Sequence, residues 1–354
     1  MKISIRTVCF VILGVVLAAV SASAQAKRWQ LAPPLNGGMA ASQPVAADSK
    51  LATSAPKKLN PEQSRYTWLE LDPLGTGKGY CYADAHAIND FDQVVVDWSD
   101  PSDCNILHAS LWDKGNWKLL DYAVDPNCAE PASYLTSINI WGFAFGTYWS
   151  GCPYEPAGGV NVKSTHWTLL PDIPGYPYNQ GFSMNDFGVA VGVDANLDMT
   201  VFQHWIWDGH KYIFLSFPSD WDVNTWWAGP LFINDWGQIA GEYFDKTQKR
   251  ERGYLQEGAK ITAFDAPGNP DGTYVNGMTN TGYLLLIGSF PDPNSPYYPN
   301  TSFLYKQGKF TALPNPPVQN PVWVTVFGVN DRGDLVGRWL DTNNNMHTYF
   351  ALRH

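Results

Sequence analysis

The chain has 354 residues, of which 45% are hydrophobic, 14% aromatic and 16% charged, and its formal net charge is -10. The high aromatic content excludes a disordered chain, and 23 Lys and Arg against 33 Asp and Glu leave no basic surface for nucleic acid. We therefore expect a folded acidic protein, and the 31 Gly and 26 Pro favour short strands joined by tight turns over helices.

Residues 1–26 have the pattern of a secretory signal peptide. Lys2 and Arg6 precede an apolar run over residues 8–20, a stretch of small residues follows, and cleavage is expected after Ala24 or Ala26. The run is shorter than the roughly 20 residues that span a bilayer, so we expect no membrane span after cleavage, with an uncleaved anchor as the alternative. The segment predicts a secreted or periplasmic protein.

Residues 27–64 are rich in Ala, Pro, Ser and Lys and show no apolar periodicity. Such a segment buries too little surface to offset the entropy of an ordered chain, so it is predicted to be a disordered linker. Residues 65–354 remain as the folded domain.

A repeated word of the form apolar-Asn-Asp-x-Gly-x-apolar-x-Gly dominates the folded domain and recurs about every 48 residues. Its copies lie at residues 87–96, 137–146, 183–192, 232–241, 277–288 and 328–337, of which the fifth is degenerate. Asn and Asp side chains bond to nearby backbone and Gly takes a positive φ, so each word predicts a β-hairpin. A calcium loop is the weaker interpretation, because no copy ends in a bidentate Glu.

A second hairpin follows each word and is clearest at residues 107–122, 202–217, 252–267 and 301–316. Six repeats of four antiparallel strands predict an all-β fold, a six-bladed β-propeller in which each blade face packs against its neighbours. The last copy ends after its third strand, whereas residues 65–71 form an extra strand before the first copy. We expect this N-terminal strand to complete the last blade and close the ring, which removes exposed edges.

The words at residues 74–79 (LGTGKG), 87–90 (AIND) and 108–112 (HASLW) resemble the bacterial extracellular repeats of the HAF family, which is named after a His-Ala-Phe word. The resemblance covers the folded domain and implies a secreted repeat protein with a β-propeller fold and no established activity. The first copy departs from the pattern at Asp92 and Val96, and the fifth has two extra residues within 284–288.

Four cysteines of the mature chain fall in the loop-rich segments that alternate with the words: Cys81, Cys104, Cys128 and Cys152. In an oxidising compartment their spacing favours disulfides Cys81–Cys104 and Cys128–Cys152, although four cysteines allow three connectivities. No close-spaced ligand pair indicates zinc, and we expect no metal or cofactor. The recurring His108, His166, His204 and His347 are interpreted as structural, because equivalent positions around a ring cannot converge on one ion.

Candidate ligand-binding residues are those that break the repeat on the rim formed by the long loops, because irregular loops on a rigid scaffold often carry binding. They are Trp149, Tyr154, Trp221, Trp226, Trp227, Tyr297, Asp97 and Asp194. Aromatic rings suit sugar rings and protein partners alike, while carboxylates bond to hydroxyls. The alternative is that these aromatics only cover the ends of the blades.

No catalytic residue is assigned. The sequence therefore favours a secreted, non-enzymatic binding or scaffold propeller that recognises a glycan or a cell-envelope protein through the loop-rich rim. The alternative is a glycan-active enzyme, a hydrolase or lyase with a carboxylate pair in the central channel. The sequence selects neither the ligand nor the oligomeric state.

Overall fold

The computed structural model describes residues 63–75, 79–99, 104, 107–121, 132–149, 158–163, 166–225, 228–267, 272–287 and 302–354. The predicted signal peptide and all but the last two residues of the predicted linker lie outside these ranges. The described residues form strands and one short 3-10 helix (Gln63–Arg65). No helix among them is long and apolar enough to cross a membrane.

In the described part of the chain the strands form six antiparallel sheets. The first sheet contains β2 (Ala83–Ile88), β3 (Gln93–Trp98), β4 (His108–Asp113) and β5 (Asn116–Leu119). The second contains β6 (Ala132–Ile138), β7 (Phe143–Trp149), β8 (Gly158–Lys163) and β9 (His166–Leu169). The third contains β10 (Tyr178–Met184), β11 (Ala190–Ala195), β12 (Phe202–Trp207) and β13 (Tyr212–Phe214).

The remaining sheets follow in chain order. The fourth contains β14 (Trp221–Asp222), β15 (Gly229–Ile233), β16 (Ile239–Asp245), β17 (Arg250–Glu257) and β18 (Lys260–Phe264). The fifth contains β19 (Tyr274–Met278), β20 (Leu284–Ile287), β21 (Ser302–Lys306) and β22 (Lys309–Ala312). The sixth contains β23 (Trp323–Val329), β24 (Leu335–Leu340), β25 (Met346–Arg353) and β1 (Tyr66–Leu71).

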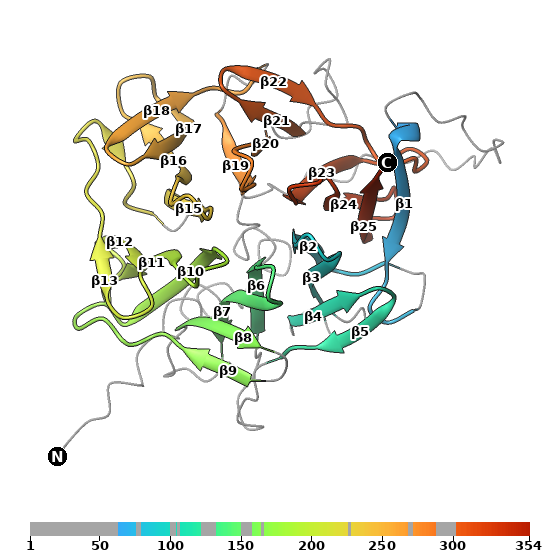
Figure 1. Cartoon of the computed structure of the whole chain (residues 1–354), viewed down its shortest axis with the longest axis horizontal. Helices are drawn as coiled ribbons and strands as arrows, with labels where there is room; N and C mark the ends of the chain where they lie inside the picture. Colours follow the sequence, from blue (N-terminus) through green and yellow to red (C-terminus); the bar gives the residue numbers. More distant parts are fainter. Residues whose placement is uncertain are drawn as a thin grey trace.

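The sheets are arranged around a common centre, with β2, β6, β10, β15, β19 and β23 innermost (Figure 1). This confirms the predicted all-β class and the β-propeller arrangement of antiparallel sheets. The fourth sheet departs from the predicted four strands, because its inner edge is divided between two short strands. β15 pairs with the first part of β16, up to Glu242, and β14 pairs with its last two residues, Phe244 and Asp245.

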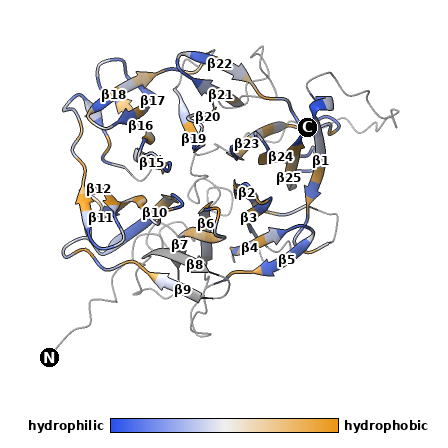
Figure 2. Cartoon of the chain, in the orientation of Figure 1, coloured by the Kyte–Doolittle hydropathy of each residue, from blue (hydrophilic) through white to orange (hydrophobic). Residues whose placement is uncertain are grey.

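Burial follows the distance from the centre. Every residue of β11 is buried, since this strand packs between neighbouring sheets on both faces, whereas the outermost strands β5, β13 and β22 are mostly exposed. The hydrophobic core lies between sheets: Val95 of the first sheet and Leu135 of the second belong to one buried cluster. Hydrophobic and hydrophilic residues accordingly alternate along many strands (Figure 2).

The N-terminal strand pairs with the C-terminal strand, as the sequence predicted for residues 65–71. β1 and β25 are antiparallel, from Tyr66 opposite Arg353 to Leu71 opposite Thr348, and the C terminus lies beside β1 (Figure 1). Leu71 is buried in a hydrophobic cluster that also contains Val94 of the first sheet and Val336 of the sixth. The two ends of the folded domain therefore share one core.

Candidate binding site on the turn face

One face of the molecule is formed by the six turns that join the two innermost strands of each sheet. We call it the turn face; it contains residues 89–92, 139–142, 185–188, 234–237, 279–282 and 330–333. In the first turn the Asn89 side-chain oxygen accepts hydrogen bonds from the backbone N–H groups of Phe91 and Gln93. The Asn of the second, third, fourth and sixth turns does the same, and Thr279 uses its hydroxyl in the fifth. The words are therefore hairpin turns, as predicted.

The asparagine amides also join each turn to the next. Each described side-chain NH₂ group bonds to the backbone oxygen of the corresponding residue in the following sheet: Asn89 to Asn139, Asn139 to Asn185, Asn185 to Asn234, Asn234 to Thr279 and Asn330 to Asn89. The last of these bonds connects the sixth sheet to the first. Thr279 has no amide, so it cannot donate this bond to Asn330.

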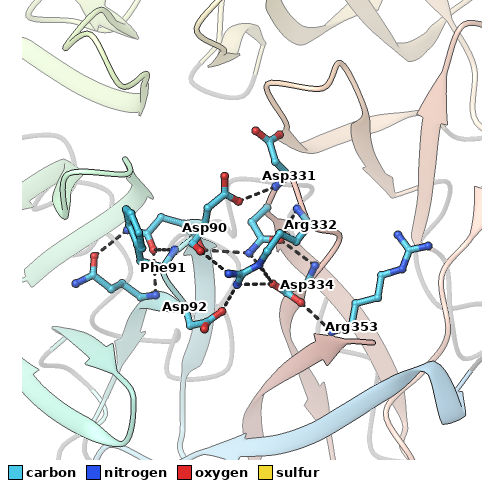
Figure 3. A network of polar contacts seen from close by, with 10 residues as sticks. Asp90, Phe91, Asp92, Asp331, Arg332, Asp334 and Arg353 are labelled. Carbon is cyan, nitrogen blue, oxygen red and sulfur yellow. Dashed lines mark hydrogen bonds and ion pairs between the residues drawn. The ribbon is translucent and has the colours of Figure 1, made fainter.

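A second series of hydrogen bonds runs one residue further along each turn. Backbone N–H groups donate to Oδ1 of an acidic or amide side chain in the next turn: Ile140 to Asp186, Asp186 to Asp235, Asp235 to Asn280, Thr281 to Asp331 and Asp331 to Asp90. We call Asp90, Asp186, Asp235 and Asp331 the acidic ring. Figure 3 shows Asp331 meeting Asp90 between the sixth and first sheets.

A pocket of about 110 Å³ lies inside this ring. It is lined by turn residues and by the ends of the innermost strands of all six sheets. Among the lining residues are His86, Thr136, Asn276 and Phe327, which sit at β-bulges where the register of an inner strand shifts. All four are buried.

The acidic ring concentrates negative charge at the mouth of this pocket. Burial, together with the hydrogen bond to Asp235 and the charges of Asp235 and Asp90, raises the pKa of Asp186 to about 6. Burial and the neighbouring Asp331 also raise the pKa of Asp90. Asp186 and Asp90 therefore hold protons more tightly than isolated carboxylates do, because burial disfavours the charged form and the neighbouring carboxylates repel it.

Four exposed aromatic side chains surround the acidic ring. Phe91, Trp141, Phe187 and Trp236 are 55%, 66%, 76% and 78% exposed, and each occupies the x position of an Asn-Asp-x-Gly word. We call them the aromatic crown. The Trp141 indole N–H donates to the backbone oxygen of Asp186, and the Trp236 indole donates to that of Asn280, which fixes both rings against the next turn.

The fifth and sixth turns, which have no crown residue, each have a cationic side chain close to the position that the aromatic side chain occupies in the other turns. At the sixth turn the Arg332 guanidinium donates to the Asp90 backbone oxygen and pairs with Asp92 and Asp334 (Figure 3). At the fifth turn the Lys306 ammonium donates to the Thr281 backbone oxygen at 2.7 Å and lies 4.5 Å from the centre of the Tyr283 ring. The turn face therefore already holds two cations, one among carboxylates and one over an aromatic ring.

Sequence reasoning placed binding on the loop-rich rim and did not single out the crown. The signal was present in the words themselves, because the residue two positions after the Asn of the first four words is Phe, Trp, Phe and Trp. In a turn of this type that side chain points away from the hairpin, so an aromatic residue recurring there is not needed for the core.

The two predicted acidic residues are buried inside the sheets. Asp97 has no exposed surface, and both carboxylate oxygens accept a hydrogen bond from the Leu135 backbone N–H of the second sheet. Asp194 is equally buried and accepts from the Trp205 indole. Burial raises the pKa of both carboxyls well above the usual range. In the structure both carboxylates therefore accept hydrogen bonds from groups of the protein itself.

The predicted aromatic residues are only partly described. Trp221 is partly buried, and its ring stacks on Tyr243 with 3.6 Å between ring centres. Trp149 ends β7, but its side chain lies outside the described residues, as do Tyr154, Trp226, Trp227 and Tyr297 altogether. The three predicted residues whose side chains are described, Asp97, Asp194 and Trp221, lie in three different sheets. The role predicted for the loop-rich rim stays a prediction.

One of the two predicted disulfides is confirmed. Cys81 and Cys104 form a disulfide, whereas Cys128 and Cys152 lie outside the described residues. Three of the recurring histidines make local contacts: His108 with Asp121, His204 with the Val223 backbone oxygen, and His347 with Glu70 and Asp341. The side chain of His166 is outside the described set. Among described residues no three His, Cys, Asp or Glu side chains form a group that could hold a metal ion.

No family model and no curated protein sequence matches this chain. Among solved structures, a mutant of AofleA from Arthrobotrys oligospora is similar with 12% identity and a TM-score of 0.47, over 80% of this chain and 86% of that one. Trypanosoma rangeli sialidase shows 10% identity and a TM-score of 0.45 over 76% of this chain, which spans only 54% of the sialidase. The β-propeller domain of the Trilobed protease from Pyrococcus furiosus shows 11% identity and a TM-score of 0.38, over 75% and 78%.

Proposed function

We propose that this protein is a secreted, non-enzymatic binding protein whose six sheets are the blades of a closed propeller and whose ligand is a glycan bound on the turn face. The pairing of β1 with β25 and the bonds from Asn330 to Asn89 and from Asp331 to Asp90 support closure. The resemblance to HAF repeats and the Cys81–Cys104 disulfide are in keeping with secretion into an oxidising compartment.

The observation that carries the binding role is the aromatic crown. Four large apolar side chains at equivalent positions stay more than half exposed around a polar pocket. A fold that buries aromatic residues efficiently elsewhere gains nothing from leaving these in water, unless a ligand covers them. Hydrogen bonds hold Trp141 and Trp236 in one orientation, so a ligand that stacks on them loses little side-chain entropy of the protein.

A glycan fits this surface better than an extended apolar partner. Flat aromatic faces match the C–H faces of sugar rings, and the carboxylates inside the crown accept hydrogen bonds from hydroxyl or amino groups. The loop-rich rim, with Trp149, Trp221 and the other predicted residues, stays a second predicted surface. A cell-envelope protein is the alternative partner.

The second candidate function is a glycan-active enzyme, and one observation favours it. Asp186 and Asp235 are adjacent carboxyls in the acidic ring, and the pKa of Asp186 is raised to about 6. A carboxyl with such a pKa can donate a proton near neutral pH, as the general acid of a glycosidase does, and a second carboxyl beside it is the other element of such a site. Released sugar would therefore point to this pair.

The test is a titration of the full chain with a panel of soluble oligosaccharides, followed by tryptophan fluorescence, with reducing ends assayed in the same wells. Binding without release is the expected result, and Trp236→Ala should weaken it at least about tenfold. Phe187→Ala should also weaken binding, whereas its control Phe214→Ala, an exposed aromatic on the outer strand β13, should not.

Two results would count against this proposal. Sugar release that Asp186→Asn abolishes would put the enzyme first. Fluorescence changes that Trp236→Ala and Phe187→Ala leave intact would move binding away from the turn face and toward the loop-rich rim.

A further inference from the structure

The negative charge of the turn face indicates the chemical class of the glycan. This inference rests on the proposed function, because it takes a glycan bound at the aromatic crown as given. We infer that the glycan carries free amino groups, as a polymer of glucosamine units does. Its sugar rings lie against the aromatic crown and its ammonium groups lie at the acidic ring.

Among the described residues no carboxylate of the acidic ring forms an ion pair, although the nearby charge of Arg332 acts on Asp90 and the Asn280 side-chain amide donates to Oδ2 of Asp235. Each of its carboxylates uses Oδ1 to accept a backbone N–H from the preceding turn, which orients the group without balancing its charge. Among the described residues, Oδ2 of Asp90 and Oδ2 of Asp331 make no hydrogen bond. A neutral or anionic glycan would leave these oxygens facing an uncharged or repelling group, and a chain of net charge -10 would repel an anion at long range as well.

The two turns that lack a crown residue show which groups this face accepts. Arg332 fills the sixth position of the ring of turns and donates to Asp90, Asp92 and Asp334. Lys306 covers the fifth turn, where its ammonium meets both a turn carbonyl and the Tyr283 ring. The chain thus places its own cations in the two kinds of site, carboxylate and aromatic, that an incoming ammonium would find at the first, third and fourth turns.

Aromatic and acidic groups alternate around the pocket in a way that suits an amino sugar. Phe91 follows Asp90, Phe187 follows Asp186 and Trp236 follows Asp235 directly in the chain. An ammonium group near a tryptophan or phenylalanine face is attracted by the ring quadrupole, and the adjacent carboxylate adds a charged hydrogen bond. A sugar that carries both an apolar face and an amine can use the two together.

The experiment compares two oligomers of one backbone and length, the glucosamine hexamer and the N-acetylglucosamine hexamer, with the full chain by isothermal titration calorimetry. We expect the glucosamine hexamer to bind at least about tenfold more tightly, and its affinity alone to fall as salt is raised. Hexalysine is the third probe, since it carries the charge without the sugar, and it should bind more weakly than the glucosamine hexamer.

Charge-removing variants locate the effect. Asp186→Asn and Asp235→Asn keep an oxygen that can accept the backbone bond from the preceding turn, so the ring stays intact while its charge falls. The double variant should reduce the preference for the glucosamine hexamer to about threefold or less. Asp198→Asn, at the opposite end of β11, is the matched control and should leave the preference unchanged.

The outcomes separate this inference from the proposed function. If the two hexamers bind with equal affinity and Trp236→Ala abolishes the binding of both, the protein binds glycans but does not select for amino groups. If hexalysine binds as tightly as the glucosamine hexamer, the charge alone accounts for binding and the sugar rings do not contribute. Binding of neither hexamer, with no response to the wider oligosaccharide panel, would overturn both.

Discussion

Buried carboxylates in this protein satisfy backbone groups that β-bulges leave unpaired. Each innermost strand shifts register at one residue, which frees a backbone N–H just before it. Asp97 accepts that of Leu135, and Glu242 accepts that of Val275. Two hydroxyl oxygens do the same in the third and sixth sheets: Thr147 accepts from the Gly181 N–H, and Ser302 accepts from the Val326 N–H.

The role of Asp97 can be tested with two variants: one removes both the carboxyl group and its acceptor oxygen, and the other removes the carboxyl group but keeps an acceptor oxygen. Asp97→Ala leaves the Leu135 N–H buried without a partner and should reduce the free energy of unfolding by about 2 kcal/mol. Asp97→Asn keeps a carbonyl acceptor and should cost less than half of that. Urea denaturation of both variants measures this. Equal losses would show that the charge, and not the acceptor, matters.

His204 gives the protein a pH-dependent stability. It is buried, it donates from Nε2 to the Val223 backbone oxygen at 2.7 Å, and burial lowers its pKa to about 4 from an ordinary value of 6.5. Because the folded pKa is depressed, the unfolded chain takes up the proton first. The stability that His204 contributes is complete above pH 6.5 and is lost as the pH falls toward 4, by about 3 kcal/mol in total.

Unfolding free energies of wild type and His204→Gln, measured between pH 7 and 4, test this linkage. The difference between the two proteins should shrink as the pH falls, because only wild type loses this contribution. A difference that is constant over the range would contradict the assignment.

At the scale of elements, the turns act as joints between sheets as well as connections within them. The Asn amide stabilises its own hairpin through Oδ1 and reaches the next turn through Nδ2. One residue type therefore serves both local and long-range contacts. The fifth turn has only the first of these functions, since Thr279 bonds to Tyr283 of its own hairpin.

Completing the series of amides should stabilise the protein. Thr279→Asn supplies an acceptor for the backbone of its own turn and a donor for the Asn330 backbone oxygen. We expect the free energy of unfolding to rise by about 1 kcal/mol, the usual net value of one hydrogen bond. The reverse change, Asn234→Thr, removes the donor to Thr279 and should lower stability by a similar amount or more. Thermal denaturation measures both, and no gain from Thr279→Asn would mean that the fifth turn does not align with the sixth.

At the scale of the whole molecule, the first strand of the folded domain holds the last sheet together. Six residues of β1 pair with β25, and Tyr66 and Leu71 are buried in two different hydrophobic clusters. Without β1, β25 would present an open edge and both clusters would be exposed to water. The contribution of this strand is therefore comparable to the whole stability of a typical domain, about 5–15 kcal/mol.

Two truncations test this dependence. Removal of residues 1–62 should leave the melting temperature unchanged, because their sequence predicts a signal peptide and a disordered linker. Removal of residues 1–71 should abolish the cooperative melting transition or yield insoluble protein. A shortened chain without β1 that still melts cooperatively at the same temperature would contradict closure by this strand.

The sequence by itself determined the features that can be read from the order of residues along the chain. The repeat, the hairpin turns, the pairing of residues 65–71 with the C-terminal strand and the Cys81–Cys104 disulfide were all predicted from it. All of these turns but the fifth are held by an Asn side chain that bonds two and four residues ahead, so their signature is local. The last repeat lacks its fourth strand and an extra strand precedes the first repeat, and both facts can be read from the order of the repeated words.

Only the tertiary structure decided where side chains point and which turns meet. Strands between two sheets are buried on both faces, so alternation does not tell whether Asp97 faces a ligand or a neighbouring backbone. The bulges add to this, because one extra residue reverses the faces of all that follow. The aromatic crown and the acidic ring come from residues about 48 positions apart, which only the arrangement of the sheets around one centre brings together.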